Sequence, residues 1–286
     1  MSGDDAAAGG HRDLVVDFYD THPINERQIL EKLAADGIAL EGLSEDVLQN
    51  YDQDHYGGVE MVDVLARLAE IDATCHVLDV CSGMGGPARY LAQNYGCRVT
   101  GIDLTESRVA GATRLTRLVG LDDRVDFRSA NALRNPFPDQ SFDAVVSQEA
   151  FGHIPNKPTL VTECVRVAKI GGRITFTDIL EGAGMTDAIR DRLGREMAFA
   201  ELETLDGYRR LLEANGCTVI EAEDMSGPWT EILRERLAMY RSLEAQTTER
   251  FGAAHFRKWE DAYGFFVGLY ETGELGGGRF LARRVR

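Results

Sequence analysis

Residues 76–92, HVLDVCSGMGGPARYLA, combine an apolar run, a glycine-rich turn and the beginning of an amphipathic helix. Gly83 and Gly85 allow the chain to turn sharply and to approach a ligand closely. Together with Ala88 they satisfy the G-x-G-x-x-A pattern, which binds dinucleotides between a strand and a helix. Because this pattern is weak alone, the neighbouring side chains must indicate which ligand the turn holds.

Asp79 lies four residues before the first of these glycines, and the turn has no lysine or arginine before Arg89. A pyrophosphate at a helix N-terminus requires N–H groups and positive charge, so a carboxylate here works against two phosphates. A zwitterionic amino acid with an adjacent cation fits better, since glycine N–H groups can hold its carboxylate and Asp79 its ammonium. Asp103 can hold ribose hydroxyls, a role that dinucleotide enzymes share. No G-K-[S/T] follows the turn, which excludes a P-loop.

These residues lie within an alternation of short β-branched runs and helical stretches. Helices are expected from Pro87, over 106–120 and over 159–169, between strands at 76–80, 97–103, 124–130, 142–148 and 173–179. Such alternation with tight glycine stops is typical of a doubly wound α/β fold with mostly parallel strands. Two further runs, 217–224 and 278–285, complete a seven-stranded sheet and form a pair that can close its edge antiparallel.

Helical segments outside this alternation predict a cap. Residues 1–10 are acidic and rich in small residues, and we expect a disordered tail there. Residues 11–72 form an N-terminal helical cap segment, and residues 73–286 form the sheet domain. Helical insertions at about 183–212 and 229–272 extend the cap over the carboxyl ends of the strands, where open α/β sheets bind ligands.

The composition limits the partners. The chain has 286 residues, 44% of them hydrophobic, which is enough for one large domain or one domain with a cap. A formal net charge of −16 repels nucleic acid and anionic membranes, so neither is expected as a partner. The amphipathic stretch TEILRERLAMYRSL would have the same pattern whether it packs within the chain or at the interface of a homodimer, so a homodimer is possible.

The five scattered cysteines form no CxxC pair and no Cys/His ligand spacing, so neither a disulfide framework nor a zinc site is expected. No cluster of His, Asp and Glu indicates a divalent metal, and we predict none. The N-terminus has no apolar signal region, and no run of about 18 apolar residues spans a membrane. We therefore expect a cytoplasmic protein.

Three features of the sequence form a set: D-x-x-x-G-x-G after the first strand, an acid that ends the second strand, and NALRNPFPDQSFDAVVSQ leading into the fourth strand. Through this set the chain resembles class I S-adenosylmethionine-dependent methyltransferases over about residues 70–180. The resemblance implies a Rossmann-like methyltransferase, with S-adenosyl-L-methionine as donor and S-adenosyl-L-homocysteine as product. It places the donor's methionine part on the first loop, ribose on Asp103 and adenine after the third strand. Asn131 stands at the adenine position, where the family usually has Asp. The donor-binding residues expected from it are Asp79, Ser82, Gly83, Gly85, Asp103, Leu104, Asn131, Ala132, Gln148 and Tyr56.

Three further stretches, YDQDHYGG (51–58), SQEAFGHIPNK (147–157) and GLYETGELGGGRFLARR near the end, resemble the sarcosine/dimethylglycine N-methyltransferases. This resemblance implies N-methylation of sarcosine or dimethylglycine towards glycine betaine. The wider group also methylates natural products, sugars and quinol-type acceptors on N or O, and this remains the alternative.

His153 is the candidate catalytic base, because it follows the fourth strand and histidine has a suitable pKa. A base matters for a secondary amine, which must shed a proton, and not for a tertiary amine. The alternative is that His153 bonds the backbone and shapes its loop. Gln53, His55, Glu149 and Trp229 are the expected contacts to the small-molecule acceptor.

Two other classes of function stay open at this point. A nicotinamide-dependent oxidoreductase would use the same glycine turn, and a donor-binding protein would lack catalysis. Binding of NADH in place of S-adenosylhomocysteine would favour the oxidoreductase.

Overall fold

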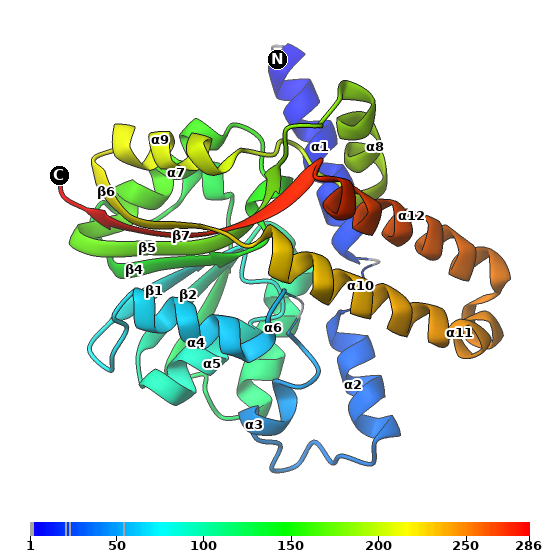
Figure 1. Cartoon of the computed structure of the whole chain (residues 1–286). Coiled ribbons are helices and arrows are strands. Elements are labelled where there is room, and N and C mark those ends of the chain that lie inside the picture. Colours follow the sequence, from blue (N-terminus) through cyan, green and yellow to red (C-terminus); the bar gives the residue numbers. More distant parts are fainter. Residues whose placement is uncertain (1–2, 21, 23, 54) are drawn as a thin grey trace.

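The computed structural model describes residues 3–20, 22, 24–53 and 55–286 (Figure 1). One seven-stranded sheet runs in the order β3-β2-β1-β4-β5-β7-β6, and only the pairs that include β7 are antiparallel. The α/β prediction with a mostly parallel sheet is therefore confirmed. The strands are β1 (His76–Val80), β2 (Arg98–Asp103), β3 (Val125–Ser129), β4 (Phe142–Gln148), β5 (Ala168–Glu181), β6 (Cys217–Asp224) and β7 (Leu275–Arg284).

Helices cover both faces of the sheet. On one face lie α4 (Gly58–Leu68), α5 (Gly86–Tyr95) and α6 (Glu106–Leu118), and on the other α7 (Lys157–Val167) and α9 (Leu205–Ala214) (Figure 1). The strand order reverses between β1 and β4, so a crevice opens at the carboxyl ends of these strands.

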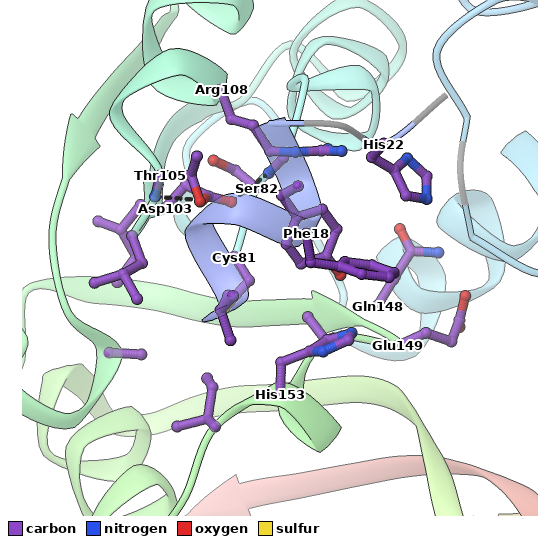
Figure 2. A pocket seen from close by; sticks show the side chains of 18 of the residues that line it. Phe18, His22, Cys81, Ser82, Asp103, Thr105, Arg108, Gln148, Glu149 and His153 are labelled. Carbon is purple, nitrogen blue, oxygen red and sulfur yellow. Dashed lines mark hydrogen bonds between the residues drawn. The ribbon is translucent and has the colours of Figure 1, made fainter. Parts of the chain in front are cut away.

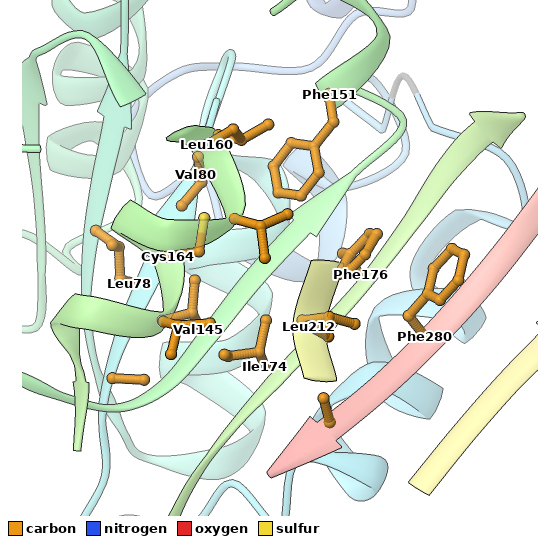
Figure 3. Close-up of a cluster of buried hydrophobic side chains, with 14 of the residues drawn as sticks. Leu78, Val80, Val145, Phe151, Leu160, Cys164, Ile174, Phe176, Leu212 and Phe280 are labelled. Atoms are coloured by element: carbon orange, nitrogen blue, oxygen red, sulfur yellow. The ribbon is translucent and has the colours of Figure 1, made fainter. Parts of the chain in front are cut away.

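The larger core cluster explains why the central strands read as continuous apolar runs. Val80, Val145 and Phe176 lie inside it, packed against Leu160 of α7 and Leu212 of α9 (Figure 3). A strand that is buried on both faces cannot alternate polar and apolar residues.

The last two strands pair as expected. β7 inserts between β5 and β6 and runs antiparallel to both. Phe280 lies opposite Phe176 in this register, and their rings stack at 4.6 Å. The C-terminal strand thus continues the core instead of forming an exposed edge.

The N-terminal segment differs from the expected disordered tail. Gly3–Asp20 form one helix, α1, so residues 3–10 are its first turns, while residues 1 and 2 lie outside the described residues. Three consecutive alanines, Ala6–Ala8, favour helix over coil at this point. The segment continues with α2 (Glu26–Ala35) and the short α3 (Glu45–Leu48).

The first insertion is shorter than the expected 183–212. It contains α8 (Asp187–Met197), but α9 packs on β6 and α7 and is thus part of the helical layer of the sheet. The second insertion begins at Ser226, slightly before the expected residue 229, and comprises α10 (Ser226–Ser242), α11 (Glu244–Phe251) and α12 (Ala253–Thr272). Among the described helices, none is both long and apolar enough to cross a bilayer.

Candidate functional site

A cavity of about 300 Å³ lies at the carboxyl ends of β1, β2 and β4. Helix α1 contributes His11, Val15, Phe18 and Tyr19, whose spacing puts them on one face of that helix. Phe18 lies over the cavity in Figure 2. Sequence-predicted residues that line the cavity are Tyr56, His55, Asp79, Ser82, Gly83, Asp103, Leu104, Asn131, Ala132, Gln148, Glu149 and His153.

Gly85 does not line the cavity, contrary to the expected donor contact. It caps α5 with a φ of +80°, a conformation that glycine adopts without strain. A Cβ at this position would overlap the ring of Phe127 and lie 2.9 Å from Nη1 of Arg89. Gly85 is therefore required for packing of the turn, whereas Gly83 faces the cavity.

The turn also uses its own N–H groups. Ser82 donates to the carbonyl of Ile102 at 2.9 Å, and Gly85 donates to the carbonyl of Ser82 at 2.8 Å. Gly83 donates to Oδ2 of Asp103 at 3.0 Å. The N–H groups of Gly83 and Gly85, two of the glycine amides expected to hold a ligand carboxylate, are thus bonded within the protein.

Two buried side chains beside Gly83 and Asp103, at what we call the donor end of the cavity, have polar atoms without partners among the described residues. Oδ2 of Asp79 and Oγ of Ser82 make no hydrogen bond, although Asp79 is 4% exposed and Ser82 is 6% exposed. Burial raises the pKa of Asp79 to about 7, with a further contribution from the charge of Asp103. A ligand that carries an ammonium group, such as S-adenosylmethionine, would satisfy these atoms.

Asp103 and Asn131, the residues expected to contact ribose and adenine, both line the cavity. Oδ1 of Asp103 accepts the N–H of Thr105 at 2.9 Å, so each carboxylate oxygen has one backbone partner and can accept another bond. Oδ1 of Asn131 accepts the N–H of Leu133 at 2.9 Å, which leaves the amide N–H₂ as donor. Asn in place of Asp therefore changes the hydrogen bonds offered to an adenine ring.

Gln53 does not line the cavity, contrary to the expected acceptor contact. Its Oε1 accepts from Nε2 of His55 at 2.6 Å, and Nε2 of Gln148 donates to Nδ1 of His55 at 3.0 Å. From outside the cavity, Gln53 thus orients the ring of His55, and His55 in turn orients Gln148 at the end of β4.

Glu149 closes the cavity from the end of β4. Its backbone φ is +45°, an uncommon conformation for a non-glycine residue. Oε1 accepts from the hydroxyl of Thr177 at 2.5 Å, and Oε2 accepts from the N–H of Tyr56 at 2.6 Å. Through these two hydrogen bonds the carboxyl joins the 55–58 segment to the sheet. Burial raises the pKa of Glu149 to about 8.

His153 lies among aromatic rings on the side of the cavity opposite Asp103 (Figure 2). Its ring stacks on Phe199 at 4.8 Å and meets the ring of Tyr19 edge-on at 5.3 Å. Nδ1 lies 3.1 Å from the carbonyl of Ala198, which can only accept, so Nδ1 carries the proton. Burial lowers the pKa of His153 to about 4, and the imidazole is therefore neutral with Nε2 as acceptor.

Trp229 does not face the cavity, contrary to its expected role. The side chain is fully buried in the cluster between α10, α12 and β7, and the ring of Tyr56 lies 4.9 Å in front of it. A Cβ at Gly277 would overlap the indole, so this glycine makes room for it. Trp229 supports Tyr56 from the core.

The α1 residues that line the cavity lie within the predicted cap segment 11–72, although none of them was predicted as a site residue. Arg108 on α6, which lines the cavity and is 5% exposed, was not predicted. A signal was present for Arg108, since it follows Asp103 by five residues and falls on the face of α6 that carries Ala112 and Leu115. In the described part of the chain, no group of three or more His, Cys, Asp or Glu residues could hold a metal ion.

The profile of a family described as "Methyltransferase domain" matches residues 78–176. The chain is 31% identical to 27-O-demethylrifamycin SV methyltransferase of Amycolatopsis mediterranei, over 78% of this chain and 82% of that protein. It is 32% identical to methyltransferase GfsG of Streptomyces halstedii, over 59% of this chain and 62% of that one.

A third relative is the glycine/sarcosine/dimethylglycine N-methyltransferase of Actinopolyspora halophila, 33% identical over 58% of this chain. The match spans only 29% of that protein's length. Among solved structures, phosphoethanolamine N-methyltransferase 2 of Haemonchus contortus, in complex with S-adenosyl-L-methionine, shares the fold with a TM-score of 0.77. It is 21% identical, over 95% of this chain and 60% of that one.

The fold, the donor end of the cavity and these relatives agree. The chain belongs to the class I S-adenosylmethionine-dependent methyltransferases.

Proposed function

We propose that the protein methylates a hydroxyl group of a largely apolar small molecule, with S-adenosylmethionine as donor. The observation that carries this proposal is the lining of the acceptor side of the cavity. That side is mostly aromatic and aliphatic, with Val15, Phe18, Ile179, Met197, Phe199 and Phe266 around the neutral imidazole of His153, and it also carries the carboxyl of Glu149.

The cations of the cavity lie at its donor end. Among the described lining residues, arginine or lysine occurs only as Arg12 and Arg108. Arg12 also lines the neighbouring hollow beside Leu104 and Thr105, and Nη1 of Arg108 lies beside the Gly83 turn. A carboxylate or phosphate on the acceptor would therefore lack the guanidinium partner that such groups favour.

The donor would be held by Asp79, Ser82, Asp103 and Asn131, each of which has a hydrogen-bonding atom left for it. When bound, S-adenosylmethionine supplies a methyl group on a sulfonium, which is already activated for displacement. The protein then has to align the acceptor and exclude water, and the cover formed by α1 serves both purposes.

Nε2 of His153 accepts the hydrogen bond of the acceptor hydroxyl. As the hydroxyl oxygen takes the methyl group and the thioether leaves, the hydroxyl proton passes through Nε2 to solvent. Because Nδ1–H is fixed on Ala198, the ring presents the same nitrogen throughout the neutral pH range. Alignment of the hydroxyl oxygen is the larger part of this role, since an imidazole with a pKa of about 4 is a weak base at pH 7.

N-methylation of sarcosine or dimethylglycine towards glycine betaine is the second candidate. It is favoured by Glu149 and Tyr56, because a carboxyl beside an aromatic ring suits the positive charge that develops on nitrogen as a neutral amine takes the methyl group. The relative from Actinopolyspora halophila bears a matching name. The carboxylate of such a substrate would have to reach Arg12 or Arg108 at the donor end.

The test is a competition between acceptors with S-adenosylmethionine that carries a labelled methyl group. We expect transfer to phenols or alcohols on apolar scaffolds, and little transfer to sarcosine, dimethylglycine or phosphoethanolamine. His153→Ala should lower kcat/KM by roughly a hundredfold, whereas the exposed His255→Ala should not change it. Higher kcat/KM for sarcosine or dimethylglycine than for every hydroxyl acceptor would establish the second candidate instead.

We further propose that catalysis needs no metal and that the protein acts in the cytoplasm as a homodimer, without nucleic-acid or membrane partners. The five cysteines are free thiols, as in a reducing compartment, and the net charge of −16 disfavours polyanions. Activity that survives EDTA and a molar mass of twice 31.6 kDa by light scattering would support these points.

A further inference from the structure

The polar groups at the donor end leave one part of the donor without a partner. Asp79 can take its ammonium group, and Asp103 can take its ribose. The backbone N–H groups of Gly83 and Gly85, which would otherwise hold the carboxylate, are bonded to Asp103 and to the carbonyl of Ser82. With these two amides bonded, a side-chain donor becomes a candidate partner for the carboxylate.

Arg108 is a buried cation beside this space. Nη1 lies 3.2 Å from the position that a Cβ of Gly83 would occupy. Arg108, Ser82 and Asp103 lie on the same side of the cavity, away from His153 and Glu149 (Figure 2). The guanidinium thus lies beside the Gly83 turn at the donor end, with the ring of Tyr19 between it and His153.

The guanidinium is also under-satisfied for a group that is 5% exposed. Nη2 donates to the carbonyl of Ile24 at 3.1 Å, Nε has no hydrogen-bond partner, and no ion pair joins Arg108 to a carboxylate in the described part of the chain. The charge of Asp103 interacts with that of Arg108, but both oxygens of that acid accept backbone N–H groups and no ion pair joins the two. A buried guanidinium without an ion pair is costly, so a ligand anion would stabilise it.

We propose that Arg108 binds the α-carboxylate of the donor's amino-acid part, with the hydroxyl of Ser82 as a second donor. The inference rests on S-adenosylmethionine as the donor, and it does not depend on which acceptor is methylated. It replaces the amide cradle expected from the glycine pattern with a charge-assisted, potentially bidentate contact.

The same guanidinium connects the donor to the cover of the cavity. It lies 4.4 Å above the ring centroid of Tyr19 in α1, and its bond to Ile24 fixes the chain that follows that helix. The carboxylate contact and the placement of α1 over the acceptor side therefore share one side chain.

The test compares S-adenosylhomocysteine with its decarboxylated analogue, in which hydrogen replaces the α-carboxylate, by calorimetric titration. The wild-type protein should bind S-adenosylhomocysteine about ten- to a hundredfold more tightly, as expected for a charged hydrogen bond. Arg108→Met should reduce this ratio to about threefold or less. Arg117→Met on the exposed face of the same helix is the matched control and should keep the wild-type ratio.

Arg108→Lys provides a second variant if the methionine variant does not fold. Lysine keeps the charge and loses the planar fork, so an intermediate ratio is expected. The role of Arg108 would be overturned if Arg108→Met kept the wild-type ratio of the two affinities. If only Arg108→Lys folds, the wild-type ratio in that variant would overturn it. Failure of the wild-type protein to bind S-adenosylhomocysteine at all would overturn the donor assignment instead, and acceptor assays would have no bearing on either result.

Discussion

The backbone N–H of Gly83 donates to Oδ2 of Asp103 across 3.0 Å, so the turn after β1 and the acid that ends β2 form one unit. The same acid accepts the N–H of Thr105. Asp103 thus organises the donor end of the cavity as well as offering oxygens to a ribose.

Asp103→Ala is therefore expected to affect both binding and folding. Loss of the ribose contact should weaken S-adenosylhomocysteine binding by about 2 kcal/mol, roughly thirtyfold. The two backbone N–H groups lose their acceptor, so the free energy of unfolding should also fall by about 1–3 kcal/mol. Calorimetric titration and urea denaturation measure the two effects, with Asp126→Ala on β3, outside the cavity, as control. An unchanged dissociation constant would show that Asp103 does not bind the donor.

The positions of these donor residues could be predicted because they depend on the strands. In a parallel sheet the carboxyl ends of β1, β2 and β4 meet at one edge, so Asp79, Asp103 and Gln148 had to lie near one another. The apolar runs that specify those strands are local in the sequence. The directions of their last side chains follow from the same runs.

The cap could not be predicted in this way. Trp229 lies on a helix with apolar residues on more than one side, and its contact with Gly277 spans 48 positions of the chain. The burial of Arg108 agrees with the face of α6 that it shares with Ala112 and Leu115, but its contact with Tyr19 depends on the docking of α1. Such placements depend on how distant elements pack, which local periodicity does not encode.

Asp79 should make donor binding pH-dependent. Its pKa of about 7 means that part of the population is protonated at neutral pH, and only the carboxylate attracts an ammonium group. The affinity for S-adenosylhomocysteine should rise by up to about tenfold from pH 6 to pH 8. Titrations over this range should show the rise in the wild type and none in Asp79→Asn. The same rise in Asp79→Asn would assign it to another group.

Stability should show the opposite trend for this residue. The folded-state pKa of Asp79 is raised above its ordinary value of 3.8, so the folded protein binds more protons between pH 4 and pH 7. The contribution of Asp79 to stability is therefore lost as the pH rises through that window. Urea denaturation without ligand should show that Asp79→Asn removes this loss.

Gly85→Ala tests the structural role assigned to that glycine. The substitution combines a φ of +80° with an overlap on Phe127, and we expect a loss of at least 2 kcal/mol of stability. Gly120 has a φ of +69° with open space around its Cβ position, so Gly120→Ala reports the backbone strain alone. Equal losses in the two variants, measured by urea denaturation, would contradict the packing role of Gly85.

His153 should destabilise the protein in acid. Burial lowers its folded-state pKa from 6.5 to about 4, so between these values the unfolded chain binds a proton that the folded protein does not. Stability must then fall as the pH drops from 6.5 to 4, by up to about 3 kcal/mol for this residue. His153→Asn does not titrate, and its amide can still donate to Ala198.

Urea denaturation at pH 7, 5.5 and 4.5 separates this effect from the titration of the carboxyl groups, which is common to both proteins. The difference in stability between the wild type and His153→Asn should shift in favour of the variant as the pH falls, while His255→Asn on the exposed start of α12 should follow the wild type. A difference that stays constant over this range would mean that the folded protein accommodates a protonated His153. The imidazole would then be cationic in weak acid, and Nε2 could no longer accept a hydrogen bond from the acceptor hydroxyl.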